Sequence, residues 1–162
     1  MEIILKKNLF KLVNRYSVMD SNGNNILRVE KRLMSMFNTY VVMDLTDNYI
    51  CEIKRKMLSV FPNYRIFFKS GRVINVKKLT GSIKKKFSVI EEGEEYFIEG
   101  DVLENMFNIK KGGEVFASVE KKVINMLKVY DIKTKEIKSI PTIISIIVAL
   151  DIIKYKKLAY LI

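Results

Sequence analysis

The sequence predicts a single, mainly β domain over residues 1–162, in which a closed antiparallel β-barrel surrounds a hydrophobic C-terminal α-helix. Three observations lead to this prediction. Short segments rich in Val, Ile, Tyr and Phe alternate with clusters of Gly, Asn and Asp, as in consecutive β-hairpins. One strand–turn–strand unit occurs twice in succession. The chain then ends in a segment that is apolar on every side, and such a segment must be covered by protein or by lipid.

The first hairpin is predicted between Arg15 and Lys31. Asn22-Gly23 stands there between two apolar runs, and both residues tolerate the positive φ angles of a tight hairpin turn. Further strands are expected at residues 40–44, 49–56, 64–69, 72–79, 87–90, 96–99, 114–122 and 128–133. Residues 32–38 are expected to form a loop or a short helix, and residues 103–107 a short helical turn.

The repeated unit aligns without a gap. The shared positions of the first copy are Tyr16, Val18, Met19, Asp20, Asn24 and Ile26, and they fall on Tyr40, Val42, Met43, Asp44, Asn48 and Ile50. The aspartate common to both copies precedes a turn, where its side chain can accept hydrogen bonds from backbone N–H groups two residues further on. We therefore interpret Asp20 and Asp44 as turn-formers, in preference to metal or catalytic roles.

The segment from Ile140 to Ile153 is predicted to be a helix buried in the barrel lumen, where it would fill a closed sheet that has no edges. Ser139 is the expected N-cap, and Pro141 falls in the first turn. The segment is shorter than the ~20 residues that a bilayer-spanning helix needs, and the carboxylate of Asp151 opposes insertion into hydrocarbon. A buried strand and contact with a membrane are the alternatives, because the run is rich in β-branched residues.

Several carboxylates are candidate functional groups. Asp151 ends the apolar segment, and a buried carboxylate there needs a partner such as a Lys or a ring of backbone amides. We expect Asp151 to orient that end of the helix. Asp101, Asp131 and the acidic turn at residues 91–95 show no spacing typical of an acid–base pair.

The composition excludes several classes of enzyme. The chain has no His and one Cys, so Ser-His-Asp and Cys-His catalytic arrangements and Cys/His zinc sites are impossible. Cys51 alone cannot form an internal disulfide, and the N-terminal residues lack the pattern of a signal peptide, so we expect a cytosolic setting. We expect no catalytic activity, no cofactor and no metal.

The chain is strongly basic, with 29 Lys and Arg against 18 Asp and Glu and a net charge of +11. Such a charge attracts nucleic acid, anionic lipid headgroups and acidic protein surfaces alike. The basic residues form pairs and triplets along the whole chain, without the block of five or more that marks a basic tail. The candidate ligand-binding residues in these clusters are Lys54, Lys56, Lys84, Lys85, Lys86, Lys121 and Lys122. The alternative is a set of independent, solvated lysines that discourage pairing between strand edges.

Two further motifs are interpreted structurally. Gly112-Gly113 follows two lysines, but the phosphate-loop pattern G-x-x-x-x-G-K-[ST] is absent, so we expect a hairpin turn there. Residues 65–69 interleave Phe with Arg and Lys, a combination that can stack on the bases of single-stranded nucleic acid. The alternation of Tyr64, Ile66 and Phe68 with Arg65, Phe67 and Lys69 is nevertheless more typical of a barrel strand.

The order of these segments resembles the LURP-one-related family. The matching positions are Arg15-Tyr16, Val18, Asp20 and Gly23; Val42 and Asp44; the run Ile53 to Leu58, then Tyr64; Tyr96, Ile98 and Gly100-Asp101; Val115, Ala117, Val119 and Lys121-Lys122; Tyr130 and Ile132; and the Ile-rich run Ser145 to Asp151. They form a pattern of many weak positions in a fixed order, from about Phe10 to Asp151. That family is related by fold to the C-terminal domain of tubby proteins and to phospholipid scramblases.

The resemblance implies a twelve-stranded antiparallel barrel around a central hydrophobic C-terminal helix, in agreement with the fold predicted from the residues. Tubby domains bind phosphoinositide headgroups and scramblases associate with membranes, but no residue of the tubby site can be matched here. We therefore expect a non-catalytic, tubby-like module without a transmembrane segment, cytoplasmic or peripheral at a membrane. Its expected ligands are anionic lipid headgroups or another anionic ligand, bound through the lysine clusters. The alternative is a scaffold that binds acidic proteins or nucleic acid through its basic surface.

Overall fold

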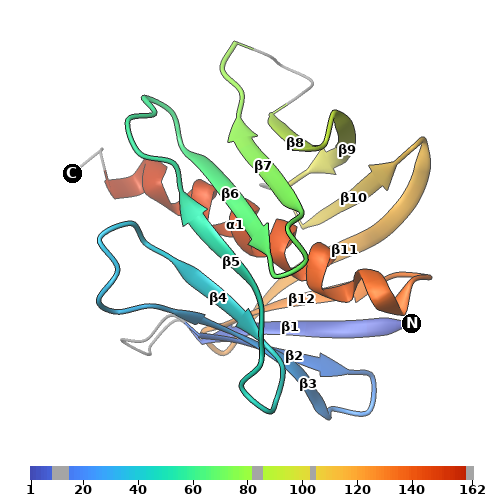
Figure 1. The fold of residues 1–162 in the computed structure, drawn as a ribbon. Helices are drawn as coiled ribbons and strands as arrows, with labels where there is room; N and C mark the ends of the chain where they lie inside the picture. The colour runs from blue at the N-terminus through green and yellow to red at the C-terminus, as the bar shows by residue number, and fades with distance from the viewer. Residues whose placement is uncertain (9–14, 82–85, 103–104, 160–162) are drawn as a thin grey trace.

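The computed structural model describes residues 1–8, 15–81, 86–102 and 105–159. It contains twelve β-strands, a short 3-10 helix and one long α-helix (Figure 1). The strands are β1 (Glu2–Asn8), β2 (Arg15–Asp20), β3 (Asn25–Lys31), β4 (Tyr40–Met43), β5 (Tyr49–Arg55), β6 (Asn63–Phe68), β7 (Val73–Lys78), β8 (Phe87–Glu91), β9 (Glu94–Asp101), β10 (Met106–Lys111), β11 (Glu114–Ile124) and β12 (Leu127–Lys133). The helices are η1 (Ile137–Ser139) and α1 (Ile140–Ala159).

The strands form one closed antiparallel barrel. Each strand pairs with its neighbours in sequence, and β1 pairs with β12 to close the sheet. At this seam Ile3 lies opposite Ile132, and Lys7 lies opposite Lys128. Closure gives every strand two partners within the sheet, so their backbone groups bond to one another instead of lining an open edge. The predicted twelve-stranded barrel is confirmed.

Alternating side chains explain why these segments form barrel strands. In β6, Tyr64, Ile66 and Phe68 are buried, whereas Arg65 and Phe67 on the other face are half-buried. The inward side chains of the strands join α1 in one hydrophobic cluster. This alternation confirms that residues 64–68 form a barrel strand.

α1 runs through the middle of the barrel (Figure 1). Every residue from Thr142 to Ile153 is buried, so the strands cover this apolar helix on all sides. The predicted buried helix is confirmed, and the buried strand is excluded. The helix continues to Ala159, beyond the predicted end. Ser139, the expected N-cap, instead donates its hydroxyl to the carboxylate of Glu136 because η1 directly precedes α1.

Within the described part of the chain, no helix combines the length and the apolar character that crossing a membrane requires.

Because the strands are antiparallel, successive strands end at opposite ends of the barrel. Odd-numbered strands end at one end of the barrel, which we call the loop end, and even-numbered strands end at the other, the turn end. α1 enters at the turn end, where Arg72 bonds to Thr142, and leaves toward the loop end, where Lys7 and Lys128 contact Asp151. Figure 1 shows the β3–β4 and β5–β6 connections on the same side as the C-terminus.

The repeated sequence unit forms two matching hairpin turns at the turn end. Asp20 Oδ1 accepts hydrogen bonds from the N–H groups two and four residues further on, both at 2.9 Å. Asp44 Oδ1 does the same at 2.8 and 2.9 Å. Hydrogen bonds from the side chain and backbone of Asn48 are the main reason why the pKa of Asp44 falls to about 2. The interpretation of both aspartates as turn-formers is confirmed.

Several local predictions are refined by the structure. Residues 32–38 form a loop, which excludes the short-helix alternative. Residues 106–107, expected in a helical turn, lie in β10, and residues 103–104 fall outside the described residues. β1 and β10 have no counterpart among the expected strands. The expected hairpin turn at Gly112-Gly113 joins β10 to β11.

Candidate functional site

A buried ion cluster ties α1 to the seam of the barrel. The Asp151 side chain is 1% exposed and pairs with Lys128 at 2.8 Å and with Lys7 at 3.3 Å. It also accepts the hydroxyl hydrogens of Tyr16 at 2.8 Å and Tyr130 at 2.5 Å. Lys7 and Lys128 lie directly opposite each other on β1 and β12, where like charges repel. Asp151 offsets this repulsion.

The surroundings of Asp151 keep it ionised. Burial by itself would raise the pKa of this carboxyl, but Lys7 and Lys128 outweigh burial and hold the pKa below its ordinary value. Burial and the adjacent carboxylate raise the pKa of Tyr130 far above its usual range. Of the two kinds of partner expected for Asp151, a lysine or a ring of backbone amides, the structure shows lysine. These contacts make the cluster a structural anchor.

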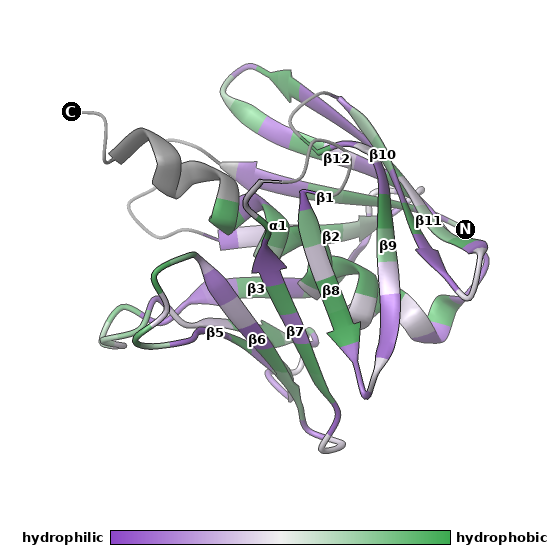
Figure 2. Ribbon diagram, turned by 90° about the horizontal axis from the view of Figure 1, so that it is seen from above, coloured by the Kyte–Doolittle hydropathy of each residue, from purple (hydrophilic) through white to green (hydrophobic). Residues whose placement is uncertain are grey.

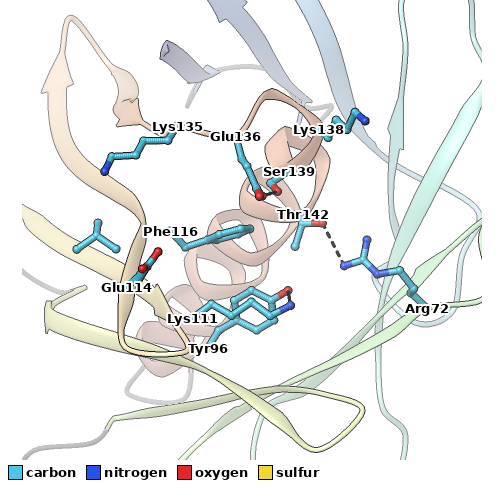
Figure 3. A pocket seen from close by; sticks show the side chains of 11 residues that line it. Arg72, Tyr96, Lys111, Glu114, Phe116, Lys135, Glu136, Lys138, Ser139 and Thr142 are labelled. Carbon is cyan, nitrogen blue, oxygen red and sulfur yellow. Dashed lines mark hydrogen bonds between the residues drawn. The ribbon is translucent and has the colours of Figure 1, made fainter.

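At the turn end, a hollow of about 360 Å³ opens beside the first turn of α1 (Figure 3). We call it the mouth pocket. Basic, aromatic and hydroxyl side chains line it together with two carboxylates. The lining residues are Arg72, Tyr96, Lys111, Glu114, Val115, Phe116, Lys135, Glu136, Lys138, Ser139 and Thr142.

Glu91 holds the cations of the mouth pocket in place. Its carboxylate, 8% exposed, accepts hydrogen bonds from Arg72 Nε at 2.6 Å and from the Tyr96 hydroxyl at 2.7 Å. Lys111 Nζ lies 3.2 Å from the Tyr96 hydroxyl oxygen and 3.7 Å from a Glu91 carboxylate oxygen. Arg72 also reaches Thr142 Oγ1 on α1 at 3.4 Å. The guanidinium and the ammonium group are therefore fixed beside the hollow.

The mouth pocket carries both positive and negative charges, so its attraction for an anion is reduced. Burial would raise the pKa of Glu91, but the hydrogen bonds from Arg72 and Tyr96 outweigh burial, so the pKa is lowered and Glu91 stays ionised. Lys135 and Lys138 are exposed and have no ion-pair partner among the described residues. The carboxylates of Glu114 and Glu136, which also line the pocket, offset part of this positive charge.

The loop end exposes apolar side chains on two neighbouring connections. In the β3–β4 connection, Met34 and Met36 are 98% and 88% exposed. In the β5–β6 connection, Leu58 and Val60 are 102% and 90% exposed. Isolated apolar residues are common on protein surfaces, but such groups at the tips of adjacent loops indicate a contact surface.

Basic residues and two hollows lie beside these apolar tips. One hollow, of about 210 Å³, is lined by both connections, including Met36 and Leu58, and by Arg55 and Lys56. The other, of about 530 Å³, lies against the β3–β4 connection and reaches Lys54. Arg55 and Lys56 have no ion-pair partner among the residues that the structure describes. The loop end therefore combines apolar tips with cations that are available to a ligand.

Comparison with known proteins identifies the family. The model of the family described as LURP-one-related matches residues 1–151. The chain belongs to the LURP-one-related family. An X-ray structure of an Arabidopsis thaliana protein is similar to it, with a TM-score of 0.60, 12% sequence identity and 91% of each chain covered. At this identity the likeness concerns the fold alone. No curated protein matches the chain.

The predicted lysines of this LURP-one-related protein lie around the rim of the loop end. Those that the structure describes are Lys54, Lys56, Lys86, Lys121 and Lys122. They belong to β5 and the residue after it, to the residue before β8, and to β11, and these three strands are not neighbours in the sheet. The topology thus brings the clusters to one end of the barrel without merging them into one patch. Lys84 and Lys85 lie outside the described residues.

Some of these lysines are already paired with carboxylates. The pairs are Lys54 with Glu52 at 2.9 Å, Lys86 with Asp101 at 2.9 Å and Lys122 with Asp131 at 3.0 Å. Lys56 and Lys121 have no such partner within the described ranges. Less charge is therefore free for a ligand than the lysine count implies.

The mouth pocket of this LURP-one-related barrel has no local sequence motif. Arg72 precedes β7, Glu91 ends β8, Tyr96 lies in β9 and Lys111 ends β10. One feature of the sequence could have indicated the pocket: charged residues flank alternate hairpin turns, and an antiparallel barrel brings these turns together at one end. Within the described residues, no cluster of His, Cys, Asp or Glu side chains is suited to hold a metal ion.

Proposed function

We propose that this LURP-one-related protein is a non-catalytic module that binds the anionic surface of a phospholipid membrane through the loop end of its barrel. The observation that supports the proposal most directly is the combination of exposed apolar tips with unpaired basic residues at that end. Lys and Arg near an anionic lipid surface contribute about 1 kcal/mol each to binding. The proposed location is the periphery of a membrane, with α1 remaining inside the barrel.

The free cations of this surface concentrate on β5 and β7. Lys56 follows β5, and Lys77 and Lys78 end β7, so all three stand at the loop end of strands that are separated only by β6. None of the three has an ion-pair partner in the described part of the chain. The nearby acid Glu52 is itself paired with Arg32 at 3.3 Å. This local excess of positive charge supports an anionic partner.

Vesicle co-sedimentation tests the proposal. We expect the protein to sediment with vesicles that contain phosphatidylserine and to remain in solution with pure phosphatidylcholine, because only the former carry negative charge. Binding should weaken as salt is added, since salt screens exposed charges. Equal, negligible binding to both vesicles would refute the proposal.

Two charge-matched triple variants locate the binding surface. Lys56→Gln, Lys77→Gln and Lys78→Gln together remove three charges at the loop end and lower the net charge from +11 to +8. This set should reduce vesicle affinity about a hundredfold. The control set, Lys69→Gln, Lys135→Gln and Lys138→Gln, removes the same charge at the turn end and should have a much smaller effect. Equal losses would contradict binding through the loop end.

A DNA titration tests the alternative of a scaffold that binds nucleic acid through its basic surface. A nucleic-acid ligand predicts binding to single-stranded DNA with a log–log salt slope that reflects the number of phosphates contacted. The lysine excess over arginine and the absence of a nucleic-acid recognition motif speak against this alternative. A flat DNA titration at low salt, together with vesicle binding, would support the membrane proposal.

A second candidate function is the binding of a small anionic ligand in the mouth pocket. The specific observation is the fixed placement of Arg72 and Lys111 beside the hollow. A titration with inorganic pyrophosphate followed by NMR should shift the amide signals around α1's first turn. Arg72→Gln should abolish these shifts, and Lys69→Gln, three residues earlier in the same β6–β7 turn, should leave them. Unchanged shifts in the Arg72 variant would reject this site.

A further inference from the structure

We propose that the exposed apolar tips of the β3–β4 and β5–β6 connections insert into the bilayer, so that the two connections act as a hydrophobic wedge. The inference rests on the proposed function and goes further, because it assigns penetration into lipid to particular residues. Its core consists of Met34, Met36, Leu58 and Val60, all at least 88% exposed. Membrane attraction by charge alone would not require any of them.

The two connections form one surface. Residues of both connections line the same small hollow, with Met36 and Phe37 from one and Met57 and Leu58 from the other. Their backbones include two residues in the left-handed region, Asn38 at φ 49° and Leu58 at φ 58°. A large apolar side chain is uncommon in that conformation and merits a functional explanation. Here the tight loop presents Leu58 entirely to the outside.

Cations surround the wedge on its barrel side. Neither connection contains an acidic residue between residues 32 and 39 or between residues 56 and 62. Arg55 and Lys56 lie at the base of the β5–β6 connection, and Arg32 begins the β3–β4 connection. Apolar groups at the tip with basic groups behind them match the bilayer interface, where hydrocarbon lies beneath anionic headgroups.

The opposite end of the barrel lacks this arrangement. Its turns are short and contain Gly, Asn and Asp, as at residues 21–24 and 44–48. Figure 2, coloured by hydropathy, shows apolar colour on the connections next to β5 and β6 beside the C-terminal side of the molecule. The asymmetry gives the barrel one end suited to lipid and one suited to water.

A lipid bilayer explains these tips better than a protein partner does. Protein interfaces are depleted in Lys at their centres, although Met and Arg are enriched there. The wedge carries Met, Leu and Val on two protruding connections, with Lys56 at the base of one of them. Separate aliphatic tips need no complementary partner surface in lipid.

Tryptophan fluorescence provides the test, because the chain contains no Trp. Leu58→Trp and Met34→Trp place single reporters on the two tips, and Leu45→Trp places one on an exposed position of the turn end. With phosphatidylserine-containing vesicles, the two tip reporters should shift to shorter wavelength and be quenched by brominated phosphatidylcholine. The Leu45 reporter should show neither change.

A polar variant provides the second measurement. Met34→Ser, Met36→Ser and Leu58→Ser together should reduce vesicle affinity about tenfold or more, because each side chain loses its transfer from water to hydrocarbon. Leu45→Ser and Ile137→Ser are exposed controls at the turn end and should leave the affinity unchanged. All five positions are exposed, so folding should be retained.

The outcomes separate this inference from the proposed function. If the protein sediments with anionic vesicles but the tip reporters show neither a blue shift nor quenching, the wedge is overturned and binding to the membrane surface still holds. A blue shift of the tip reporters that grows with protein concentration in the absence of vesicles would also overturn the wedge. It would indicate that the tips contact a second copy of the protein. Failure to sediment with anionic vesicles would overturn the proposed function, and the wedge with it.

Discussion

Lys128 Nζ donates a hydrogen bond to Asp151 Oδ1 at 2.8 Å, although neither side chain is more than 2% exposed. Lys128 is the second residue of the last strand, and Asp151 lies more than one helical turn before the end of α1. With Lys7 across the seam, this pair fastens the internal helix to the two strands that close the barrel. Closure of the sheet and seating of the helix are thus linked.

Asp151→Asn should destabilise the protein by about 3–5 kcal/mol, because the variant leaves Lys7 and Lys128 buried and opposite each other without a counter-charge. Urea unfolding followed by circular dichroism measures the loss. Asp131→Asn is the matched control, since Asp131 pairs with Lys122 in a more exposed position and should cost no more than about 1 kcal/mol. Similar losses in both variants would contradict the anchoring role of Asp151.

The same carboxylate predicts the direction of acid sensitivity. The folded pKa of Asp151 lies below its unfolded value of about 3.9, so the folded state binds the proton less readily than the unfolded chain. Its contribution to stability is therefore complete above about pH 4 and is lost as the pH falls through the folded pKa. Unfolding free energies measured between pH 2 and pH 6 should show a smaller acid loss in Asp151→Asn than in the unchanged protein.

Gly100→Ala should destabilise the barrel by about 3 kcal/mol or more. Gly100 has φ +99°, and a Cβ there would stand 2.9 Å from the Met106 carbonyl oxygen and 3.1 Å from Phe107 Cα, both of which belong to the backbone of β10. Gly113 has φ +84° but open space around it. Gly113→Ala should therefore cost only the left-handed penalty of about 1–2 kcal/mol. Equal losses in chemical denaturation would show that the close approach to β10 is unimportant.

Cys51 should be inert toward thiol reagents in the folded protein. It is fully buried, and burial raises the pKa of its thiol to about 12. Reaction with a chromogenic disulfide at pH 8 should be roughly a thousandfold slower in buffer than in denaturing urea, because the thiolate fraction falls about tenfold for each unit of pKa. As Cys51 is the single cysteine, the reaction reports unfolding directly. Comparable rates in both solvents would show that the strand around Cys51 opens readily.

Glu91→Gln should lower the unfolding free energy by about 1–2 kcal/mol. The change removes the charge that Arg72 and Lys111 face, but both cations are partly exposed and water screens the loss. Glu92→Gln, at the exposed neighbouring turn position, should have almost no effect. A Glu91 variant as stable as the control would mean that the network at the mouth pocket contributes nothing to folding.

Short-range chemistry was sufficient to predict much of the fold. Asn22-Gly23 and Asp44 act on backbone groups two to four residues away, so their hairpins could be predicted locally. The apolar run after Ile140 has no polar stripe, and its burial followed from that alone. β10 was not predicted because its first two residues, Met106 and Phe107, lie in the segment expected to form a short helical turn.

Contacts between residues far apart in the chain could not be predicted from the sequence. Lys7 and Asp151 are separated by 144 positions, and Arg72, in the β6–β7 turn, bonds to Glu91 of the β8–β9 hairpin. No periodicity connects such residues, because periodicity describes only neighbours along one strand or helix.

The order of apolar and turn-forming residues specifies the strands, the repeated hairpin and a helix that has to be enclosed. Pairing of the strands decides which charges neutralise one another across the sheet and which remain free. It brings Lys86 and Lys122 to carboxylates on neighbouring strands and leaves Lys56 beside an apolar loop tip. The physical reason is that charge pairing depends on distances of a few ångströms across the sheet, and those distances exist only after the strands have closed around the helix.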